Sequence, residues 1–247
     1  MEITDLYSEI VEKLEKKANP KIASDDRFFH KVAGFKSYGI RAPVFGELFK
    51  PYRSVLKQLS FGEKLELARM FFQSGFIEQE TFGIAVLSYG AREMEPANFD
   101  FLDEIAGYIN NWGATDYFSL SVLQPLLRAY PNETMRFLRK WNESENLWKR
   151  RASVVAFTRK IGSSGKFTQE ALELCHNLIW DKEDLVQKGV GWALKDVMRG
   201  DKQRVLKYVK ALRRKGVSAI ITLYAIRDLK GNERKKVLRI NPNGKSF

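Results

Sequence analysis

The chain has 247 residues, of which 44% are hydrophobic and 29% charged, a composition that excludes a mainly disordered protein. No stretch approaches the roughly 18 apolar residues of a membrane span. The acidic amino-terminal segment lacks the apolar core of a secretory signal, so we expect a cytoplasmic protein. One cysteine and two histidines exclude an internal disulfide and leave too few ligands for a structural zinc site.

The net charge of +12 is concentrated in the second half of the chain. Residues 1–135 hold 15 Lys and Arg against 19 Asp and Glu, whereas residues 136–247 hold 27 against 11. Such asymmetry is typical of proteins that bind nucleic acid, with an anionic membrane surface as the second possibility. A basic surface that only contacts solvent is the alternative.

Apolar side chains at helical spacing predict helices along nearly the whole chain, beginning with residues 3–17. Ser60 and Glu63 match a capping box that opens a helix through Phe71. No alternating apolar stretches flank a tight turn, so strands are poorly supported. Further helices are expected at about 27–34, 43–57, 78–90, 97–110, 113–128, 131–140, 146–160, 168–180, 183–199, 203–213 and 217–229.

The predicted helices come in pairs that are joined by brief polar loops. A period of about 35–45 residues per pair is typical of a HEAT-like repeat. We therefore predict an all-α fold, a single HEAT-like α-solenoid domain over residues 1–247 with a basic concave groove. An ordinary helical bundle is the alternative. The tail from about residue 231 to residue 247 is expected to be disordered.

Two loops interrupt this pattern. In the segment 36–43, Gly39 ends one helix and Pro43 starts the next. In the segment 159–167, a glycine- and serine-rich tip lies between basic residues. This second segment is interpreted either as a finger able to touch a DNA backbone or as a flexible connector. It is not a phosphate-binding P-loop, because the required Gly-Lys-Ser/Thr ending is missing.

Aromatic and charged side chains stand out along the predicted helices. Trp112 and Asp116 lie four residues apart, which places them on one helical face. Trp148 with Arg151, and then Trp192, follow later in the chain. Indole rings attract cations and arginine binds phosphate. Together they suggest a site for a cation attached to a polyanion, such as alkylated DNA.

Four segments, taken together and in order, resemble the AlkD-type DNA alkylation repair family. They are Tyr-Gly-Ile-Arg-Ala-Pro at 38–43, Asn-Trp-x-x-x-Asp at 111–116, Asn-Leu-Trp-Lys-Arg-Arg-Ala at 146–152 and Gln-Lys-Gly-Val-Gly-Trp-Ala-Leu-Lys at 187–195. The resemblance covers about residues 20–230. It implies a HEAT-like solenoid that holds duplex DNA in its groove. It also implies a glycosylase that removes cationic alkylpurines such as 3-methyladenine and 7-methylguanine, with no cofactor and no metal. We expect a monomer.

The resemblance also assigns roles to individual residues. The catalytic residues would be Asp116, Trp112 and Trp192, and the DNA-contacting arginine would be Arg151. Further candidate DNA contacts are Arg150, Lys149, Arg41, Tyr38, Lys188 and Lys195. Alternatives remain for several of them: Lys149 and Arg150 are either phosphate contacts or solvated charges, and Tyr38 either stacks on nucleic acid or packs under its loop. Trp148 is interpreted as core packing.

The chain departs from close AlkD proteins in two places. Residues 113–115, Gly-Ala-Thr, replace the more polar residues of close AlkD proteins, and the loop at 159–167 is longer than theirs. Both departures resemble the AlkF/AlkG branch, whose members look like binders of branched DNA without glycosylase activity. A non-catalytic DNA-structure-binding protein is therefore the second hypothesis. A helical scaffold for an acidic protein partner is the third.

Overall fold

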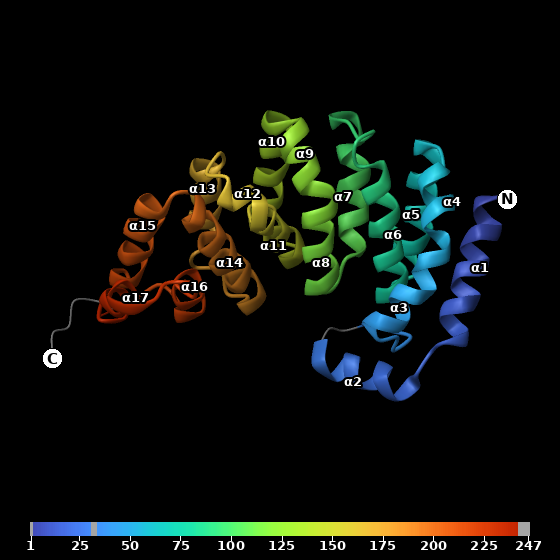
Figure 1. The fold of residues 1–247 in the computed structure, drawn as a ribbon, viewed down its shortest axis with the longest axis horizontal. Helices are drawn as coiled ribbons and strands as arrows, with labels where there is room; N and C mark the ends of the chain where they lie inside the picture. The colour runs from blue at the N-terminus through green and yellow to red at the C-terminus, as the bar shows by residue number, and fades with distance from the viewer. Residues whose placement is uncertain (1, 31–33, 242–247) are drawn as a thin grey trace. The chain divides into compact units, whose positions relative to one another are not determined.

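The protein is all-helical in a computed structural model that describes residues 2–30 and 34–241 (Figure 1). Within these ranges the β pairing consists of an isolated bridge between Lys36 and Phe76. The predicted fold class is confirmed. The chain divides into two compact units, Met1–Tyr130 and Pro131–Phe247. That they form one continuous domain stays a prediction. None of the described helices has both the length and the apolar character needed to cross a membrane.

The first unit is a stack of helices built on an aromatic core. Its helices are α1 Ile3–Lys16, α2 Pro20–His30, α3 Ala42–Phe49, α4 Arg53–Gln58, α5 Phe61–Gln73, α6 Ile77–Gly90, α7 Phe99–Tyr108, α8 Trp112–Phe118 and α9 Gln124–Ala129. The ring of Phe82 on α6 lies 5.1 Å from that of Phe45, 4.9 Å from Phe49 and 5.6 Å from Phe71, between ring centroids. α6 packs against α5 and α8, so this core supports the helix that carries Trp112.

The predicted capping box is present: the Glu63 amide donates to Ser60 Oγ at 3.3 Å, and the Ser60 amide donates to Glu63 Oε2 at 2.7 Å. Elsewhere in the unit, proline changes the expected helices. The helix expected at 43–57 is divided by a 3-10 turn, Lys50–Tyr52, that contains Pro51. The helix expected at 113–128 contains a π turn, Ser119–Leu123, directly before Gln124 and Pro125. Proline has no N–H to donate and its ring crowds the preceding turn, so the α-helical hydrogen-bond pattern changes at both places, to a tighter turn near Pro51 and a wider one before Pro125.

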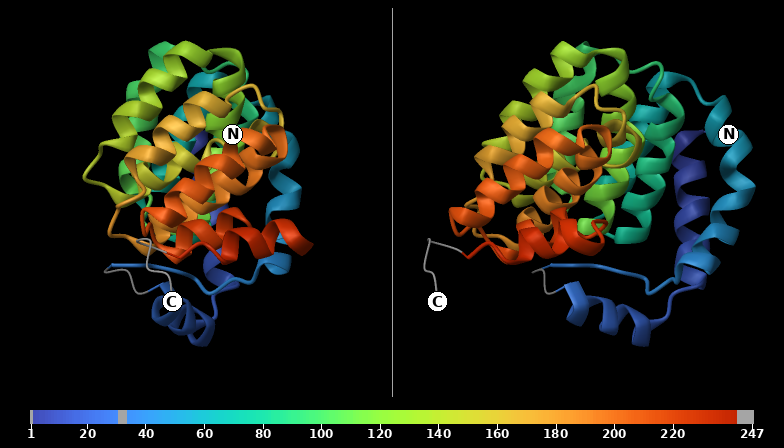
Figure 2. Two further views of the ribbon diagram at one scale, coloured as in Figure 1. Left: turned by 90° about the vertical axis from the view of Figure 1, so that its left-hand side faces the viewer. Right: turned by 60° about the vertical axis from the view of Figure 1, so that its left-hand side comes forward.

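The helix expected at 27–34 begins earlier, at Pro20, and residues 31–33 of that prediction lie outside the described residues. The resulting α2 lies crosswise to α1 (Figures 1 and 2). Pro20 occupies the first helical position, where a missing N–H costs no helical hydrogen bond. The side chain of Asn19 accepts from the amides of Lys21 and Ile22 at 3.1 and 3.2 Å and caps this start.

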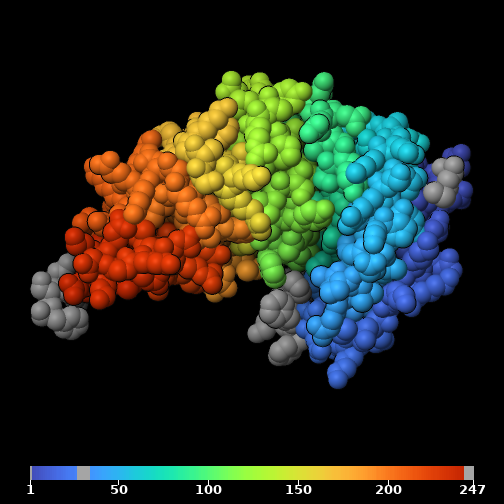
Figure 3. All heavy atoms as spheres, in the orientation of Figure 1, coloured from blue at the N-terminus to red at the C-terminus, as the bar shows by residue number. Residues whose placement is uncertain are grey.

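The second unit is arranged around one long helix. Its helices are α10 Pro131–Asn142, α11 Leu147–Val155, α12 Arg159–Ser163, α13 Thr168–Asn177, α14 Asp184–Gly200, α15 Lys202–Arg214, α16 Ala219–Ala225 and α17 Gly231–Leu238. α14 packs against α11, α12, α13, α15 and α16. Side chains fill the space between successive helices within each unit (Figure 3).

Two predictions for this unit are wrong. The segment 159–167 is neither a finger nor a flexible connector, because it contains α12, packed on α14. Its glycines allow this contact: a Cβ on Gly162 would lie 2.9 Å from the Val197 nitrogen, and one on Gly165 would lie 3.1 Å from the Gly200 carbonyl oxygen, both on α14. The expected disordered tail contains α17, in which Val237 is fully buried. Residues 242–247 of that prediction lie outside the described residues.

Corresponding ion pairs recur at a regular separation along the chain. In the first unit Arg69 on α5 donates to both oxygens of Glu104 on α7, 35 residues later. In the second unit Arg139 on α10 donates to both oxygens of Glu173 on α13, 34 residues later. Each pair links the first helices of two successive helical pairs. This separation fits the lower end of the predicted repeat period and a solenoid-like stacking of helical pairs within each unit.

Candidate functional site

Trp112 and Asp116 occupy successive turns of α8, as their spacing predicts. Trp112 is 41% exposed, and Asp116 is partly buried. The opposite face of α8, formed by Ala114, Thr115 and Phe118, is buried in the first unit. Residues 113–115, which depart from close AlkD proteins, therefore lie largely on the buried face of α8. The Trp112 indole and the Asp116 carboxylate lie on the opposite face.

The start of α8 is held by a buried polar pair. Asn111 is fully buried, and its Oδ1 accepts from the amide of Ala114 at 2.8 Å. Its Nδ2 donates to Glu80 Oε2 at 3.1 Å. Glu80 on α6 is also fully buried, and its Oε1 has no hydrogen-bond partner within the described residues. Burial raises the pKa of the Glu80 carboxyl to about 8, although the hydrogen bond from Asn111 opposes this shift.

The loop before α3 is fixed by a second buried acid. Glu78 accepts from the amides of Tyr38 and Ile40 at 3.0 and 3.1 Å. Gly39 adopts a φ of +73°, and a Cβ there would lie 2.3 Å from the Asn19 carbonyl oxygen, so this turn requires glycine. Arg41 follows directly, at the start of α3, with an exposed side chain.

Tyr38 packs under this loop. The residue is 8% exposed, and its ring stacks on that of Phe76 at a centroid distance of 4.2 Å. Its hydroxyl accepts from Gln79 Nε2 at 2.8 Å. Of the two interpretations of Tyr38, this placement fits packing and not stacking on a base.

Arg151 and Trp148 lie on α11 in the second unit, and both are buried. The core role predicted for Trp148 is confirmed. Arg151 is 5% exposed, and its Nη1 donates to the carbonyl oxygen of Leu185. Gly189 on α14 lies against the stem of Arg151, because a Cβ there would be 3.4 Å from Arg151 Cγ. The first glycine of the Gly-Val-Gly-Trp segment thus allows α11 and α14 to pack closely.

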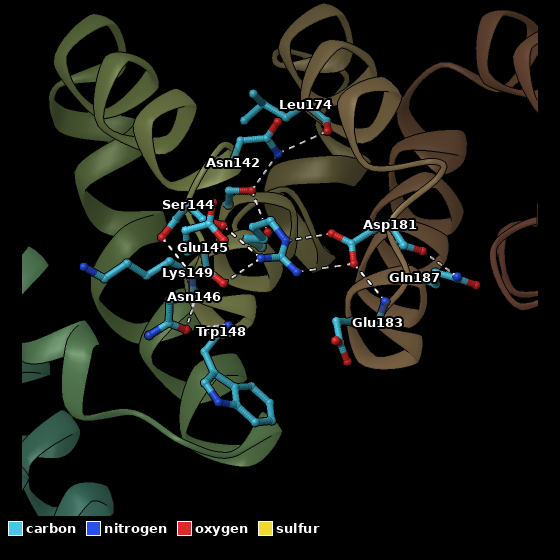
Figure 4. A network of polar contacts seen from close by, with 12 residues as sticks. Asn142, Ser144, Glu145, Asn146, Trp148, Lys149, Leu174, Asp181, Glu183 and Gln187 are labelled. Atoms are coloured by element: carbon cyan, nitrogen blue, oxygen red, sulfur yellow. Dashed lines mark hydrogen bonds and ion pairs between the residues drawn. The ribbon is translucent and has the colours of Figure 1, made fainter. Parts of the chain in front are cut away.

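Arg150 is engaged within the protein, not in solvent. Its Nε donates to Asp181 Oδ2 at 2.7 Å, and its Nη1 donates to the carbonyl oxygens of Ser144 and Glu145, both at 2.9 Å. Figure 4 shows this network between the start of α11 and the segment before α14. The side chains of Arg150 and Asp181 are 18% and 6% exposed. Of the two interpretations of Arg150, a solvated charge is therefore wrong. A contact between Arg150 and a DNA phosphate stays a prediction.

The three candidate lysines of this unit differ in their surroundings. Lys149 Nζ lies 5.8 Å from the centroid of the Trp141 ring. Lys195 Nζ lies 3.2 Å from Asp196 Oδ1. Lys188 on α14 is exposed. Of these three, Lys188 is the most accessible to a polyanion.

Trp192 is partly buried on α14, and the guanidinium carbon of Arg159 lies 5.7 Å from the centroid of its ring. Neither Arg159 nor Glu80 was among the residues predicted for the site. Glu80 lies in the polar start of α6, Glu-Gln-Glu-Thr at 78–81, where no pattern distinguished it from a surface acid. No local pattern marked Arg159. The structure thus places Trp112 and Asp116 together in the first unit, and Arg151 and Trp192 on the packed helices α11 and α14 of the second.

Comparisons with known proteins concern the family and the fold of the chain. A family model described as "DNA alkylation repair enzyme" matches residues 10–229. A solved structure, titled a predicted DNA alkylation repair enzyme from Enterococcus faecalis, is similar with a TM-score of 0.69 and 16% identity. The similarity covers 86% of this chain and 97% of that one, and at this identity it supports the fold alone. No curated protein shows significant similarity.

Proposed function

Since the chain belongs to the family of DNA alkylation repair enzymes, we propose that it is a DNA glycosylase for positively charged alkylpurines in duplex DNA. Its substrates would be bases such as 3-methyladenine and 7-methylguanine, and water would replace the base at the sugar. The observation that carries this proposal is the pairing of an exposed indole and a carboxylate on adjacent turns of the capped helix α8.

The proposed chemistry needs only a few groups. A purine alkylated at N3 or N7 is already cationic, so it leaves without a general acid. The barrier lies in the positive charge that develops on the sugar as the glycosidic bond breaks. A carboxylate near the anomeric carbon stabilises that charge and orients or deprotonates the attacking water. We assign this role to Asp116.

The remaining residues would bind the damaged nucleotide. An indole face attracts a cation by roughly 0.5–2 kcal/mol, so Trp112 and Trp192 would favour a cationic base over a neutral one. Arg151 would bind a phosphate beside the lesion through its planar guanidinium, which lysine does not reproduce. The exposed Arg41 and Lys188 would add contacts to the DNA backbone. The proposed mechanism uses no metal or cofactor.

The direct test measures base release from methylated duplex DNA by the wild type and by Asp116→Asn. We expect the wild type to free 3-methyladenine or 7-methylguanine and the variant to lose at least about 100-fold in rate, the scale of a lost electrostatic contact. Asp100→Asn, which neutralises an exposed carboxylate on α7, is the matched control. Equal rates of base release by wild type and Asp116→Asn would show that the Asp116 carboxylate takes no part in the reaction.

The second candidate is a protein that binds branched DNA without cutting a bond. It is favoured by the basic composition of the second unit, where residues 131–247 hold 27 Lys and Arg against 12 Asp and Glu. Binding of DNA requires positive charge on the protein, and it does not require a catalytic carboxylate. Wild-type protein that releases no alkylpurine yet binds a four-way junction more tightly than a linear duplex would establish this second function.

A further inference from the structure

Arg159 has an unusual backbone. It adopts a φ of +53°, and it is the only non-glycine residue with a positive φ in the described part of the chain. This left-handed region costs an ordinary L-residue roughly 1 kcal/mol or more, whereas glycine adopts it freely. Such strain persists only where surrounding contacts impose it, and it occurs often at functional sites. The contacts around Arg159 therefore indicate what the strain achieves.

A buried carboxylate imposes this conformation. Asp196 on α14 is 1% exposed, and its Oδ2 accepts from the Arg159 amide at 2.7 Å. The cations of Lys195 and Arg199 lie 3.2 Å from its other oxygen, Oδ1, and stabilise its negative charge. A hydrogen bond from a backbone amide to a buried carboxylate is among the stronger ones in proteins. Asp196 thus anchors the start of α12 to α14.

The side chain of Arg159 is directed to Trp192. Its guanidinium lies over the indole at 5.7 Å from the ring centroid, while the residue as a whole is exposed. No carboxylate within the described residues forms an ion pair with it. In this it differs from Arg150, which pairs with Asp181, and from Arg199, which pairs with Asp228. Stacking on an indole orients the flat guanidinium and leaves its N–H donors at the edge accessible.

From these three observations we propose that Arg159 is a DNA-phosphate ligand, held in a strained backbone by Asp196 and oriented by Trp192. It would bind the backbone next to the nucleotide whose base meets Trp192. One indole face is taken by the guanidinium, so a cationic base would approach the ring from its other face. This inference rests on the DNA binding of the proposed function, and it does not depend on bond cleavage.

The test compares binding of an undamaged duplex by wild type, Arg159→Gly and Arg159→Gln, with Lys160→Gln as the control. Lys160 is the next residue of α12, is exposed and carries the same charge. Each Arg159 variant should bind about tenfold more weakly, as expected for a lost charge-assisted contact. The slope of log affinity against log salt should become shallower by about 0.9, one phosphate contact. Lys160→Gln should change affinity less than about twofold, since a diffuse surface charge is screened.

Arg159→Gly also reports on the strain. Glycine relieves the left-handed backbone, so this variant should melt at the same or a higher temperature than wild type while it binds DNA more weakly. Equal losses in Arg159→Gln and Lys160→Gln, or a lower melting temperature in Arg159→Gly, would overturn the inference. Wild-type affinity in Arg159→Gly overturns this inference alone. Wild-type protein that binds no duplex overturns both this inference and the proposed function.

Discussion

The two units carry predicted site residues on short, asparagine-capped helices, but they hold those helices by different chemistry. In the first unit, Asn111 at the start of α8 is bonded to the buried acid Glu80. In the second, the start of α11 is held by Arg150, which pairs with Asp181 and donates to two carbonyl oxygens. The first anchor uses a carboxyl group whose pKa burial raises to about 8, so that it is mainly neutral at pH 7. The second needs two opposite charges.

The two units also show that the net charge of a unit differs from the number of its cations that are available to bind DNA. Residues 1–130 hold 15 Lys and Arg against 18 Asp and Glu, and residues 131–247 hold 27 against 12. Nevertheless Arg150 and Arg199 in the basic unit are engaged by carboxylates of the same unit. Net charge therefore overstates the number of cations that can meet a phosphate. Arg159 and Lys188 are better candidates for that contact than Arg150.

The largest effect is expected from Asp181→Ala. It leaves the guanidinium of Arg150, 18% exposed, without its carboxylate, and it removes the acceptor of the Glu183 amide. Removing one partner of a largely buried pair costs about 3 kcal/mol. Urea denaturation followed by helical circular dichroism measures the loss. Glu145→Ala, an exposed acid whose backbone carbonyl alone meets Arg150, is the control. A loss below about 1 kcal/mol would show that the carbonyl contacts suffice without Asp181.

The second prediction concerns the pH dependence of Glu80→Gln. Between the ordinary pKa of a glutamate and its folded pKa of about 8, Glu80 is protonated in the folded state and ionised in the unfolded state. The folded state then binds more protons, so this group lowers wild-type stability by about 1.4 kcal/mol per pH unit as pH rises through that window. Glutamine does not titrate. Its stability relative to wild type should increase by roughly 2–3 kcal/mol from pH 5 to pH 7.

Urea denaturation at pH 5, 6 and 7 measures this difference. Glu66→Gln, which removes an exposed carboxylate on α5, controls for net charge. A difference between Glu80→Gln and wild type that stays constant with pH would mean that Glu80 is ionised in the folded protein, and that the first unit is not anchored by a neutral acid.

Local patterns account for what the sequence predicted. The i,i+4 spacing of Trp112 and Asp116 and the capping box at Ser60 involve residues within one or two helical turns, and both are present. The paired helices follow from apolar periodicity in the same way. The fold class and most helix positions could therefore be predicted. Exact helix ends near Pro51 and Pro125 could not, because a proline in a helical pattern either ends the helix or distorts it.

Contacts between distant segments account for what was missed. Asp181 lies 31 residues from Arg150, and Asp196 lies 37 from Arg159, so no short motif revealed either partner. The Gly-Ser-Ser-Gly tip after residue 161 has the composition of a flexible loop, yet Gly162 and Gly165 pack against α14. Composition indicates conformational freedom in an isolated segment and does not show which helix will pack on it.

The third prediction compares the two caps. Asn111 and Asn146 have the same role at α8 and α11, but Asn111 is fully buried and also bonded to Glu80, whereas Asn146 is partly exposed. Asn146→Ala should cost about 1 kcal/mol, the usual value of a cap. Asn111→Ala should cost about 2 kcal/mol, because Glu80 also loses its hydrogen bond. Equal losses in urea denaturation would mean that the Glu80 contact adds nothing to the cap.

The smallest effect is expected for two surface ion pairs, one in each unit. Arg69 with Glu104 and Arg139 with Glu173 are both bidentate, and their side chains are 38–45% exposed. Because solvent screens exposed charges, double-mutant cycles with alanine should give a coupling energy below about 1 kcal/mol for each pair. The two couplings should be alike and should shrink in 1 M salt, where the screening length is about 3 Å. A clearly larger coupling for Arg139 with Glu173 would show that the surrounding basic charge of the second unit strengthens even its exposed carboxylate contacts, so that ion pairing there reflects the field of the whole unit as well as local geometry.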